Sequence, residues 1–339
     1  MSIIIRKFNL IILCFFFLSC TEKHAPDLKS QQQVPAGPVE ITKPVEDAPQ
    51  NKPAIKPEKE AKKDHRKVVL VTTGSFNPVH LSHIALLEKA KMALTQKGYD
   101  VAAGIISPSY DPYLKNKMLA KLKEDGVAHP TPEQIADVFA SAPERLMLIS
   151  CAIKSLGLSD WVFPSAWEST QKNFISFPEV ALHFLEQLKS QSKKGEIIEV
   201  WFVMGEDLAA RAGSPAKGLN ASGTTIPVVV VKREGENTGF KCQDPKKCIL
   251  IESNESDLSS TAVRKKFAEL KKKPHDSTII NELEKLIGRD VLVTILEKGW
   301  YGLEETRDKI ELSNPHWKGS FSSCPIPPKD VLPLILNRF

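Results

Sequence analysis

Apolar and polar positions follow two different periods along the chain after residue 67. Short apolar runs rich in β-branched residues, beginning with residues 68–71, predict strands that are buried on both faces of a parallel sheet. Between these runs, apolar positions recur at helical spacing, which predicts amphipathic helices. The predicted strands are residues 68–71, 101–106, 161–163, 197–204, 226–231 and 248–251. The predicted helices are residues 82–96, 143–156, 179–190, 261–272, 277–287 and 290–298.

Strands that alternate with helices predict the α/β class, here a doubly wound Rossmann-like parallel sheet flanked by helices, with C-terminal helices after the last strand. We expect this folded domain to span residues 68–302. Residues 303–339 are expected to be a C-terminal extension, which has few periodic signals and ends in a mixture of proline and apolar residues. The pattern indicates neither a role for that extension nor an oligomeric state.

The beginning of the chain has the layout of an export signal. Arg6 and Lys7 precede a short apolar run that ends at Ser19-Cys20. The run is shorter than the roughly 20 residues that a membrane-spanning helix needs. A cysteine after a small residue resembles a bacterial lipoprotein signal, in which Cys20 would carry the lipid. We therefore expect residues 1–20 to be a lipoprotein-type signal and the protein to be membrane-anchored and extracytoplasmic. The alternative is a cytoplasmic protein whose N-terminal segment is not processed.

Residues 21–67 differ in composition from everything that follows. They are rich in Pro, Lys, Glu and Gln and contain almost no large apolar side chains. Such a segment cannot bury enough apolar surface to offset the entropy lost on ordering. We expect it to be a disordered tether.

Charge and cysteine content narrow the possible functions only slightly. The net charge of +5 is small for 339 residues, and it does not predict nucleic-acid binding, which would need a concentrated basic face. Six cysteines are too few for a disulfide scaffold in a chain of this length. Cys242 and Cys248 flank a turn-like stretch and could pair in an exported protein, although free thiols fit the sequence equally well.

The segment Gly74–His83 carries the first candidate chemistry. A predicted strand precedes it and a predicted helix follows it, and in open α/β sheets this is where ligands meet the N–H groups of a helix N-terminus. Gly74 allows the backbone to approach a ligand closely. His80 and His83 are spaced so that both rings can lie on one side of the first helical turn and donate hydrogen bonds to polyphosphate oxygens. Taken alone, the His-x-x-His pair could be a surface pair or, less often, half of a metal site.

Ser259-Ser260-Thr261 stands just before another predicted helix. Its hydroxyl groups can cap that helix, whose N–H groups can then face a phosphate. Arg264, one turn further, offers a bidentate fork to phosphate oxygens. The alternative is an ordinary helix cap followed by a surface arginine.

Together the two segments resemble the signatures of the nucleotidyltransferase superfamily. Residues 74–83 are similar to the motif G-x-F-x-P-x-(H/T)-x-x-H, and residues 259–264 resemble the end of I-S-S-T-x-x-R, with Leu258 in place of Ile. Within the superfamily, the chain resembles the eukaryotic type of the nicotinamide/nicotinate mononucleotide adenylyltransferase family. Further similar segments, in the order typical of that family, are residues 104–108, 111–115, 161–162, 167–172 and 205–208.

The resemblance implies that ATP and nicotinamide (or nicotinate) mononucleotide are joined to form NAD (or its acid form) and pyrophosphate. The 5′-phosphate of the mononucleotide would attack the α-phosphorus in line, and no general base is required because this nucleophile is already ionised. Mg²⁺ would bridge triphosphate oxygens with few protein ligands. The amide or acid form is not distinguished.

The resemblance also implies a role for individual residues. It implies catalytic roles for His80, His83 and Arg264. The residues that it implies for binding ATP and phosphate are Gly74, Ser75, Phe76, Lys115, Ser259, Ser260 and Thr261. Binding of the mononucleotide falls to Trp167, as a platform for the pyridine ring, and to Asp207, which would position nucleotide hydroxyls.

Some features depart from the family pattern. His80 stands where eukaryotic-type members usually have threonine, and the second ring-stacking tryptophan is absent between Leu208 and Thr225. An insertion-like stretch, residues 120–142, follows Lys115, and Lys117 or Lys121 could take the place of that lysine.

An exported protein would meet little ATP, which keeps two alternatives open. One is a membrane-tethered nucleotide-binding protein without turnover. The other is a different nucleotidyltransferase, such as a cytidylyltransferase. The Trp-Glu-Ser-x-Gln-Lys segment of residues 167–172 favours a pyridine mononucleotide over the latter.

Overall fold

The computed structural model describes residues 66–194, 196–212, 215–232, 238–253, 258–313, 324–328 and 330–339. The predicted lipoprotein-type signal and the predicted tether up to residue 65 lie outside the described residues. In the part of the chain that the structure describes, no helix is both long enough and apolar enough to cross a membrane.

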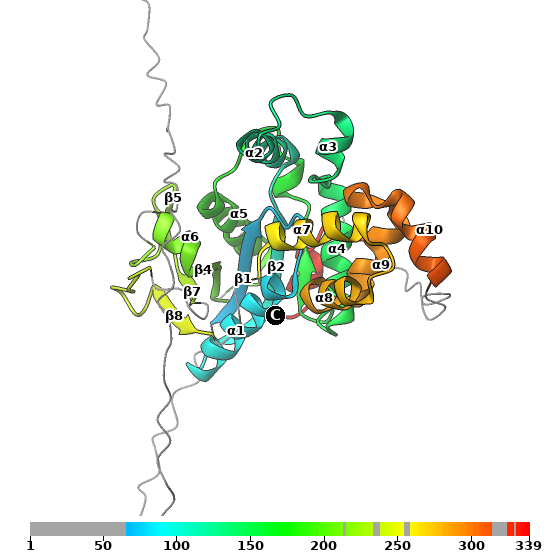
Figure 1. Ribbon diagram of the computed structural model, residues 1–339. Coiled ribbons are helices and arrows are strands. Elements are labelled where there is room, and N and C mark those ends of the chain that lie inside the picture. The colour runs from blue at the N-terminus through cyan, green and yellow to red at the C-terminus, as the bar shows by residue number, and fades with distance from the viewer. Residues whose placement is uncertain are drawn as a thin grey trace, which may run out of the picture. The chain divides into compact units, whose positions relative to one another are not determined.

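A parallel sheet forms the centre of the described fold (Figure 1). Its six strands lie in the order β3-β2-β1-β4-β7-β8 among the described residues, and every neighbouring pair is parallel. The strands are β1 (Lys67–Gly74), β2 (Asp100–Pro108), β3 (Val162–Pro164), β4 (Ile198–Gly205), β7 (Val228–Lys232) and β8 (Cys248–Glu252). The predicted doubly wound α/β fold is confirmed.

The strand order places a topological switch point between β1 and β4. From β1 the chain moves outward through β2 to β3, and it then returns to the other side of β1 as β4. The segments that follow β1 and β4 therefore leave neighbouring strands in opposite directions, and open α/β sheets bind ligands at the carboxyl edge of such a point.

Helices cover both faces of the sheet (Figure 1). The α-helices are α1 (Leu81–Gln96), α2 (Asp111–Glu124), α3 (Pro132–Ala136), α4 (Ala142–Ser155), α5 (Phe177–Gln191), α6 (Glu206–Arg211), α7 (Ser260–Lys272), α8 (Ser277–Ile287), α9 (Arg289–Lys298), α10 (Glu304–Ser313) and α11 (Leu332–Leu336). Two short 3-10 helices are η1 (Glu168–Thr170) and η2 (Trp300–Gly302). An antiparallel hairpin, β5 (Leu219–Ala221) and β6 (Thr224–Ile226), precedes β7.

Alternate residues of β1 enter two separate cores. Val68 and Leu70 pack with α1, α4, α7, α8 and α9, whereas Val69 and Val71 pack with α5 and α11 on the opposite face. This division follows from the strand geometry, in which successive side chains point to opposite faces of the sheet. Both faces are apolar, and for this reason the strands read as continuous hydrophobic runs.

The residues after Gly302 contribute to both cores. Leu303 and Ile310 are buried with α9, whereas Val331 and Ile335 are buried with α5. The described parts of the predicted C-terminal extension therefore pack as part of the folded unit.

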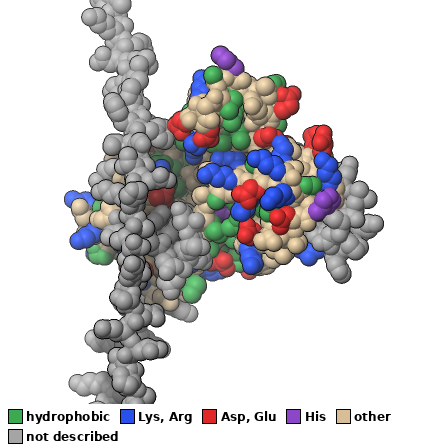
Figure 2. All heavy atoms as spheres, in the orientation of Figure 1, with side chains coloured by type: hydrophobic (Ala, Val, Ile, Leu, Met, Phe, Trp, Pro, Cys, Tyr) green, Lys and Arg blue, Asp and Glu red, His purple; other side chains and the backbone are tan. Residues whose placement is uncertain are grey.

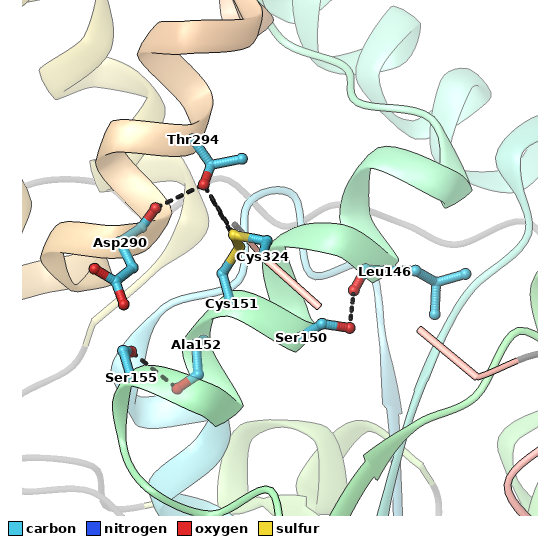
Figure 3. Close-up of a disulfide and its surroundings, with 8 residues drawn as sticks. All are labelled: Leu146, Ser150, Cys151, Ala152, Ser155, Asp290, Thr294 and Cys324. Carbon is cyan, nitrogen blue, oxygen red and sulfur yellow. Dashed lines mark hydrogen bonds between the residues drawn. A yellow bond between two sulfur atoms is a disulfide. The ribbon is translucent and has the colours of Figure 1, made fainter. Parts of the chain in front are cut away.

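A disulfide between Cys151 of α4 and Cys324 joins residues 173 positions apart (Figure 3). The Thr294 hydroxyl of α9 lies 3.0 Å from the Cys324 sulfur. A second disulfide joins Cys242 and Cys248 and closes a short loop, which is the pairing considered from the sequence. The Cys151–Cys324 bond could not be inferred from spacing, because its partners are distant along the chain.

Candidate active site

The loop between β1 and α1 is shaped by its own side chains. A Cβ atom on Gly74 would lie only 3.3 Å from the Phe76 ring, which explains why glycine fits this position. Phe76 is buried and has a left-handed φ of 45°, which is uncommon for a bulky residue. The backbone of Ser75 accepts a hydrogen bond of 2.8 Å from the fully buried Arg145. The loop backbone thus packs against the Phe76 ring, and it is hydrogen-bonded to Arg145 of α4.

His80 and His83 form a stacked pair at the start of α1. Their ring centroids are 3.5 Å apart with an interplanar angle of 22°. The backbone N–H of His80 donates to Nδ1 of His83 over 3.1 Å. Because Nδ1 accepts this bond, a neutral His83 ring carries its proton on Nε2, where it can be donated to an oxygen atom. The predicted placement of both rings on one side of the helical turn agrees with this geometry.

Helix α7 docks directly onto the same loop. The Arg264 Nη1 atom donates to the carbonyl oxygen of Asn77 over 2.5 Å, and the Ser260 hydroxyl donates to the carbonyl oxygen of Pro78 over 2.9 Å. Partial burial lowers the pKa of the Arg264 guanidinium, although arginine stays charged at neutral pH. The two sequence signatures therefore meet, although they are more than 180 residues apart.

The three hydroxyl residues at the start of α7 have different tasks. Ser259 is the N-cap and accepts a hydrogen bond of 3.2 Å from the backbone N–H of Ala262. Ser260 uses its single O–H on the loop, so its side chain fastens the helix to the loop. Thr261 is exposed and accepts a bond of 3.2 Å from Arg264. Its hydroxyl therefore helps to orient the guanidinium, while the N–H groups of this first turn remain suited to a phosphate.

Helix α2 places Lys117, and not Lys115, next to the loop. The Lys117 Nζ atom lies 3.5 Å from the Ser75 hydroxyl. Lys117 is exposed, yet desolvation of its ammonium group and the positive charges of Arg264 and Arg211 lower its pKa, while Asp207 acts in the opposite direction. Lys115 is exposed on the same helix.

Asp207 lies in the first turn of α6, directly after β4. Its carboxylate pairs with Arg211 over 2.7 Å. The charge of Asp207 raises the pKa of Lys117 and that of Arg211 lowers it, and the Lys117 Nζ atom lies 3.5 Å from the Ser75 hydroxyl of the β1–α1 loop. The segments that follow β1 and β4 thus supply charged groups to the same switch point.

Trp167 stands before η1 and presents a stacked aromatic pair. Its ring lies parallel to that of His183 from α5, with centroids 3.6 Å apart and an interplanar angle of 8°. Burial lowers the pKa of His183, which favours the neutral imidazole. The neighbouring Glu168 is almost fully buried, and this burial raises the pKa of its carboxyl to about 8.

Some residues around the site were not found by sequence reasoning. Arg145 bridges the loop to Ser109 and to Asp111 at the start of α2, over 2.6 and 2.7 Å. Tyr301 donates to the Asn77 side chain over 3.0 Å. His183 has no motif of its own. The available signal for Arg145 was an arginine on the apolar stripe of a predicted helix, where a buried charge must find partners.

Lysines on the outer face of α7 form ion pairs with acidic side chains. Figure 2 shows Lys and Arg side chains gathered over this helix and interleaved with acidic ones. Lys266 pairs with Glu269 and Glu282, and Lys271 pairs with Asp137, each over 2.8 Å. The outer face of α7 is thus a solvated, ion-paired surface.

A sequence profile of the cytidylyltransferase-like family matches residues 71–266, which is more than half of the chain and includes both signature segments. The chain therefore belongs to this family.

Among individual relatives, it is similar to proteins named nicotinamide/nicotinic acid mononucleotide adenylyltransferase. The protein from Arabidopsis thaliana is 28% identical over 179 residues, which cover 50% of this chain and 63% of the relative. The protein from Oryza sativa subsp. japonica is 29% identical, over 56% of this chain and 68% of the relative. A protein from Caenorhabditis elegans that carries the same name with the number 2 is 29% identical, over 51% and 70%.

The aligned region covers less than two thirds of the Arabidopsis relative and about half of this chain. The resemblance stated from the motifs is confirmed.

Proposed function

We propose that this protein transfers the adenylyl group of ATP to nicotinamide or nicotinate mononucleotide, forming a dinucleotide and pyrophosphate. The observation that carries the proposal is the docking of Arg264 and Ser260 on the loop that presents His80 and His83. These groups all belong to the two signature segments. They combine hydrogen-bond donors and positive charge at a helix N-terminus, as stabilisation of phosphate oxygens requires.

The chemistry needs positioning and charge more than proton transfer. The 5′-phosphate oxygen of the mononucleotide forms a bond to the α-phosphorus of ATP while the bond to the pyrophosphate oxygen breaks in line. We assign the imidazole N–H groups of His80 and His83 to the α-phosphate and the leaving oxygen. Arg264 and the N–H groups that begin α7 are assigned to the leaving pyrophosphate.

Mg²⁺ enters this proposal together with ATP. Magnesium prefers oxygen ligands, keeps several waters and is commonly held through substrate phosphates, so it would neutralise charge on the triphosphate. Among the described residues, no group of three or more His, Cys, Asp or Glu side chains could hold a metal ion.

The mononucleotide would lie toward Trp167. The half-buried indole offers a flat apolar surface to a pyridine ring, and the stacked His183 keeps it in place. Asp207 would accept hydrogen bonds from nucleotide hydroxyls at the end of β4.

The test is a direct assay of the full chain. The purified protein is incubated with magnesium and ATP plus each mononucleotide, and separately with CTP plus a phospho-alcohol, and products are followed by chromatography and pyrophosphate release. Formation of a pyridine dinucleotide is expected. Saturable ATP binding without any dinucleotide would instead support a binding protein without turnover, and a product made only from CTP would support a cytidylyltransferase.

Lys117 is expected to contribute more to ATP use than Lys115. Replacing Lys117 with alanine should lower kcat/KM for ATP about 10- to 100-fold, because it removes a charge-assisted donor beside Ser75. The matched Lys115→Ala variant on the same helix should change kcat/KM less than about threefold, because only Lys117 of these two exposed lysines contacts Ser75. Steady-state kinetics on both variants decides between them, and a larger loss in the Lys115 variant would restore the assignment made from the sequence.

We also propose that the chain is exported and anchored through a lipid on Cys20. Two disulfides in one chain favour an oxidising compartment, where such bonds form and persist. An exported enzyme would need a source of ATP outside the cytoplasm, so the compartment is tested separately from the activity. Incorporation of labelled palmitate in cells, lost in a Cys20→Ser variant, is the expected result; an unlabelled soluble wild-type protein would reject the anchor.

A further inference from the structure

The buried side chain of Asn77 connects the candidate active-site loop to two other segments, the loop between α3 and α4 and the turn after α9. Its Nδ2 atom donates to the carbonyl oxygen of Val138 over 2.7 Å. Its Oδ1 atom accepts from the backbone N–H of Ala140 and from the Tyr301 hydroxyl, each over 3.0 Å. Asn77 is 1% exposed, so these polar groups depend on protein partners. The amide thus serves as the inner anchor of the loop.

Tyr301 reaches Asn77 through an unusual turn after α9. Gly299, Tyr301 and Gly302 all have left-handed φ values, of 66°, 59° and 67°. A tyrosine in this region is rare and costs free energy, so surrounding contacts must hold it there. A Cβ on Gly302 would lie 1.8 Å from the Asp137 carboxylate, so a larger residue there would require the Asp137 side chain to move. This turn directs the Tyr301 side chain inward, which an ordinary helix end would not do.

The surroundings of Tyr301 hold its hydroxyl as a hydrogen-bond donor. The side chain is 2% exposed, and its ring packs against Phe267 of α7 with centroids 5.3 Å apart. Burial raises the pKa of the Tyr301 hydroxyl well above its ordinary value, so the proton stays on the oxygen at physiological pH. One donor hydrogen is therefore always available for Asn77.

The two ends of Asn77 are held by different elements. The Tyr301 hydroxyl binds its side chain, whereas Arg264 binds its backbone carbonyl. His80 follows Asn77 by three residues. A shift of Asn77 would therefore move both the histidine pair and the arginine that contacts the loop.

We propose that Tyr301 is a positioning residue, whose hydroxyl holds Asn77 and thereby aligns His80, His83 and Arg264 with the reacting phosphates. The inference rests on the proposed function for its activity readout. It adds a contribution from the turn after α9, which belongs to neither signature segment.

The test is the Tyr301→Phe substitution in the full chain. The ring and its packing on Phe267 are retained, and only the hydroxyl is lost. We expect kcat per folded molecule, with the folded fraction measured by circular dichroism, to fall about 10-fold, because small misplacements of reacting groups are costly. The KM values for ATP and mononucleotide should stay within about twofold of the wild type, since the binding side chains are unchanged.

Tyr99→Phe is the matched control. Tyr99 precedes β2 at the amino end of the sheet, where its ring contacts Trp201. This variant should keep the wild-type kcat. An unchanged kcat in Tyr301→Phe, or an equal loss in Tyr99→Phe, would overturn the proposal.

A second measurement does not depend on turnover. Hydrogen–deuterium exchange of a peptide covering residues 75–83 should be at least about fivefold faster in Tyr301→Phe than in the wild type, and unchanged in Tyr99→Phe, since local opening follows the loss of local contacts. If exchange in this peptide is the same in all three proteins, the hydroxyl does not hold the loop and the proposal is rejected. If the wild type makes no dinucleotide but the three proteins differ in exchange as expected, the proposed function is rejected and the positioning role of Tyr301 is not.

Discussion

Replacing His83 by alanine is expected to reduce kcat about 10²- to 10³-fold, the usual cost of removing one donor that stabilises transition-state charge. The His80 backbone N–H donates to Nδ1 and so orients the imidazole, and the proton of the neutral ring is then on Nε2, the atom that we assign to a phosphate oxygen. Alanine is a good helix former and suits the first turn of α1, so the fold should persist. Turnover is measured as dinucleotide formation at saturating ATP and mononucleotide.

The control for this prediction is His129→Ala. His129 is exposed in the loop between α2 and α3, so its loss should leave kcat unchanged. Circular dichroism and the thermal midpoint of the His83 variant should match those of the wild type. A folded His83→Ala protein with wild-type kcat would remove His83 from the mechanism.

Replacing Cys324 by serine is expected to lower the free energy of unfolding by about 3–5 kcal/mol, which would be a large part of the total stability. The Cys151–Cys324 bond links positions 173 residues apart, and the chain-entropy relation gives greater stabilisation to longer loops. Serine is small and polar and can keep a hydrogen bond to the Thr294 hydroxyl, so the loss should reflect the missing covalent link (Figure 3). Urea unfolding followed by circular dichroism gives the value.

The second disulfide supplies the comparison. Cys242 and Cys248 are only six positions apart, and the same relation gives about 2 kcal/mol for a loop of that length. Cys242→Ser should therefore lower the urea midpoint less than Cys324→Ser does. Adding a reductant should bring the urea midpoint of the wild type close to that of a variant that carries both Cys324→Ser and Cys242→Ser. Equal midpoints for wild type and Cys324→Ser under oxidising conditions would show that the long-range bond does not stabilise the fold.

Most of the sheet could be predicted because its strands are apolar on both faces. The hydrophobic runs locate β1, β2, β4, β7 and β8 to within a few residues at most ends. The predicted strand at residues 226–231 contains Pro227, and the structure divides it between β6 and β7 at that residue. Proline cannot donate to a strand ladder, which explains the break.

The elements that were missed have weak apolar patterns. Helix α2 buries only Leu114 and Met118 among its described residues, and its other positions are mainly polar. Its apolar stripe is too sparse to be recognised from periodicity. Hairpin β5–β6 turns at Ser222 and Gly223, both with positive φ, and its strands are too short for a visible alternation.

Some residues of the candidate site could be predicted from the sequence, and others depended on how the helices pack. The signature segments bring together residues of known chemical types in a fixed order, so His80, His83 and Arg264 could be chosen from the sequence. The choice between Lys115 and Lys117 depended on which side of α2 faces the loop, which polar residues on a helix do not indicate. The contact of His183 with Trp167 depended on how α5 packs against η1.

The sequence by itself determined the class of fold and located the two segments that resemble the family signatures, because both follow from local pattern. Hydrophobic period specifies strand or helix, and the glycine, histidine and hydroxyl residues are concentrated at strand and helix ends. Only the tertiary structure decided how Tyr301 reaches Asn77, how Ser260 and Arg264 bind the β1–α1 loop, and which cysteine pairs with Cys151. These contacts join residues that are far apart along the chain. Their partners depend on how whole helices and strands pack, which local hydrophobic periodicity does not predict.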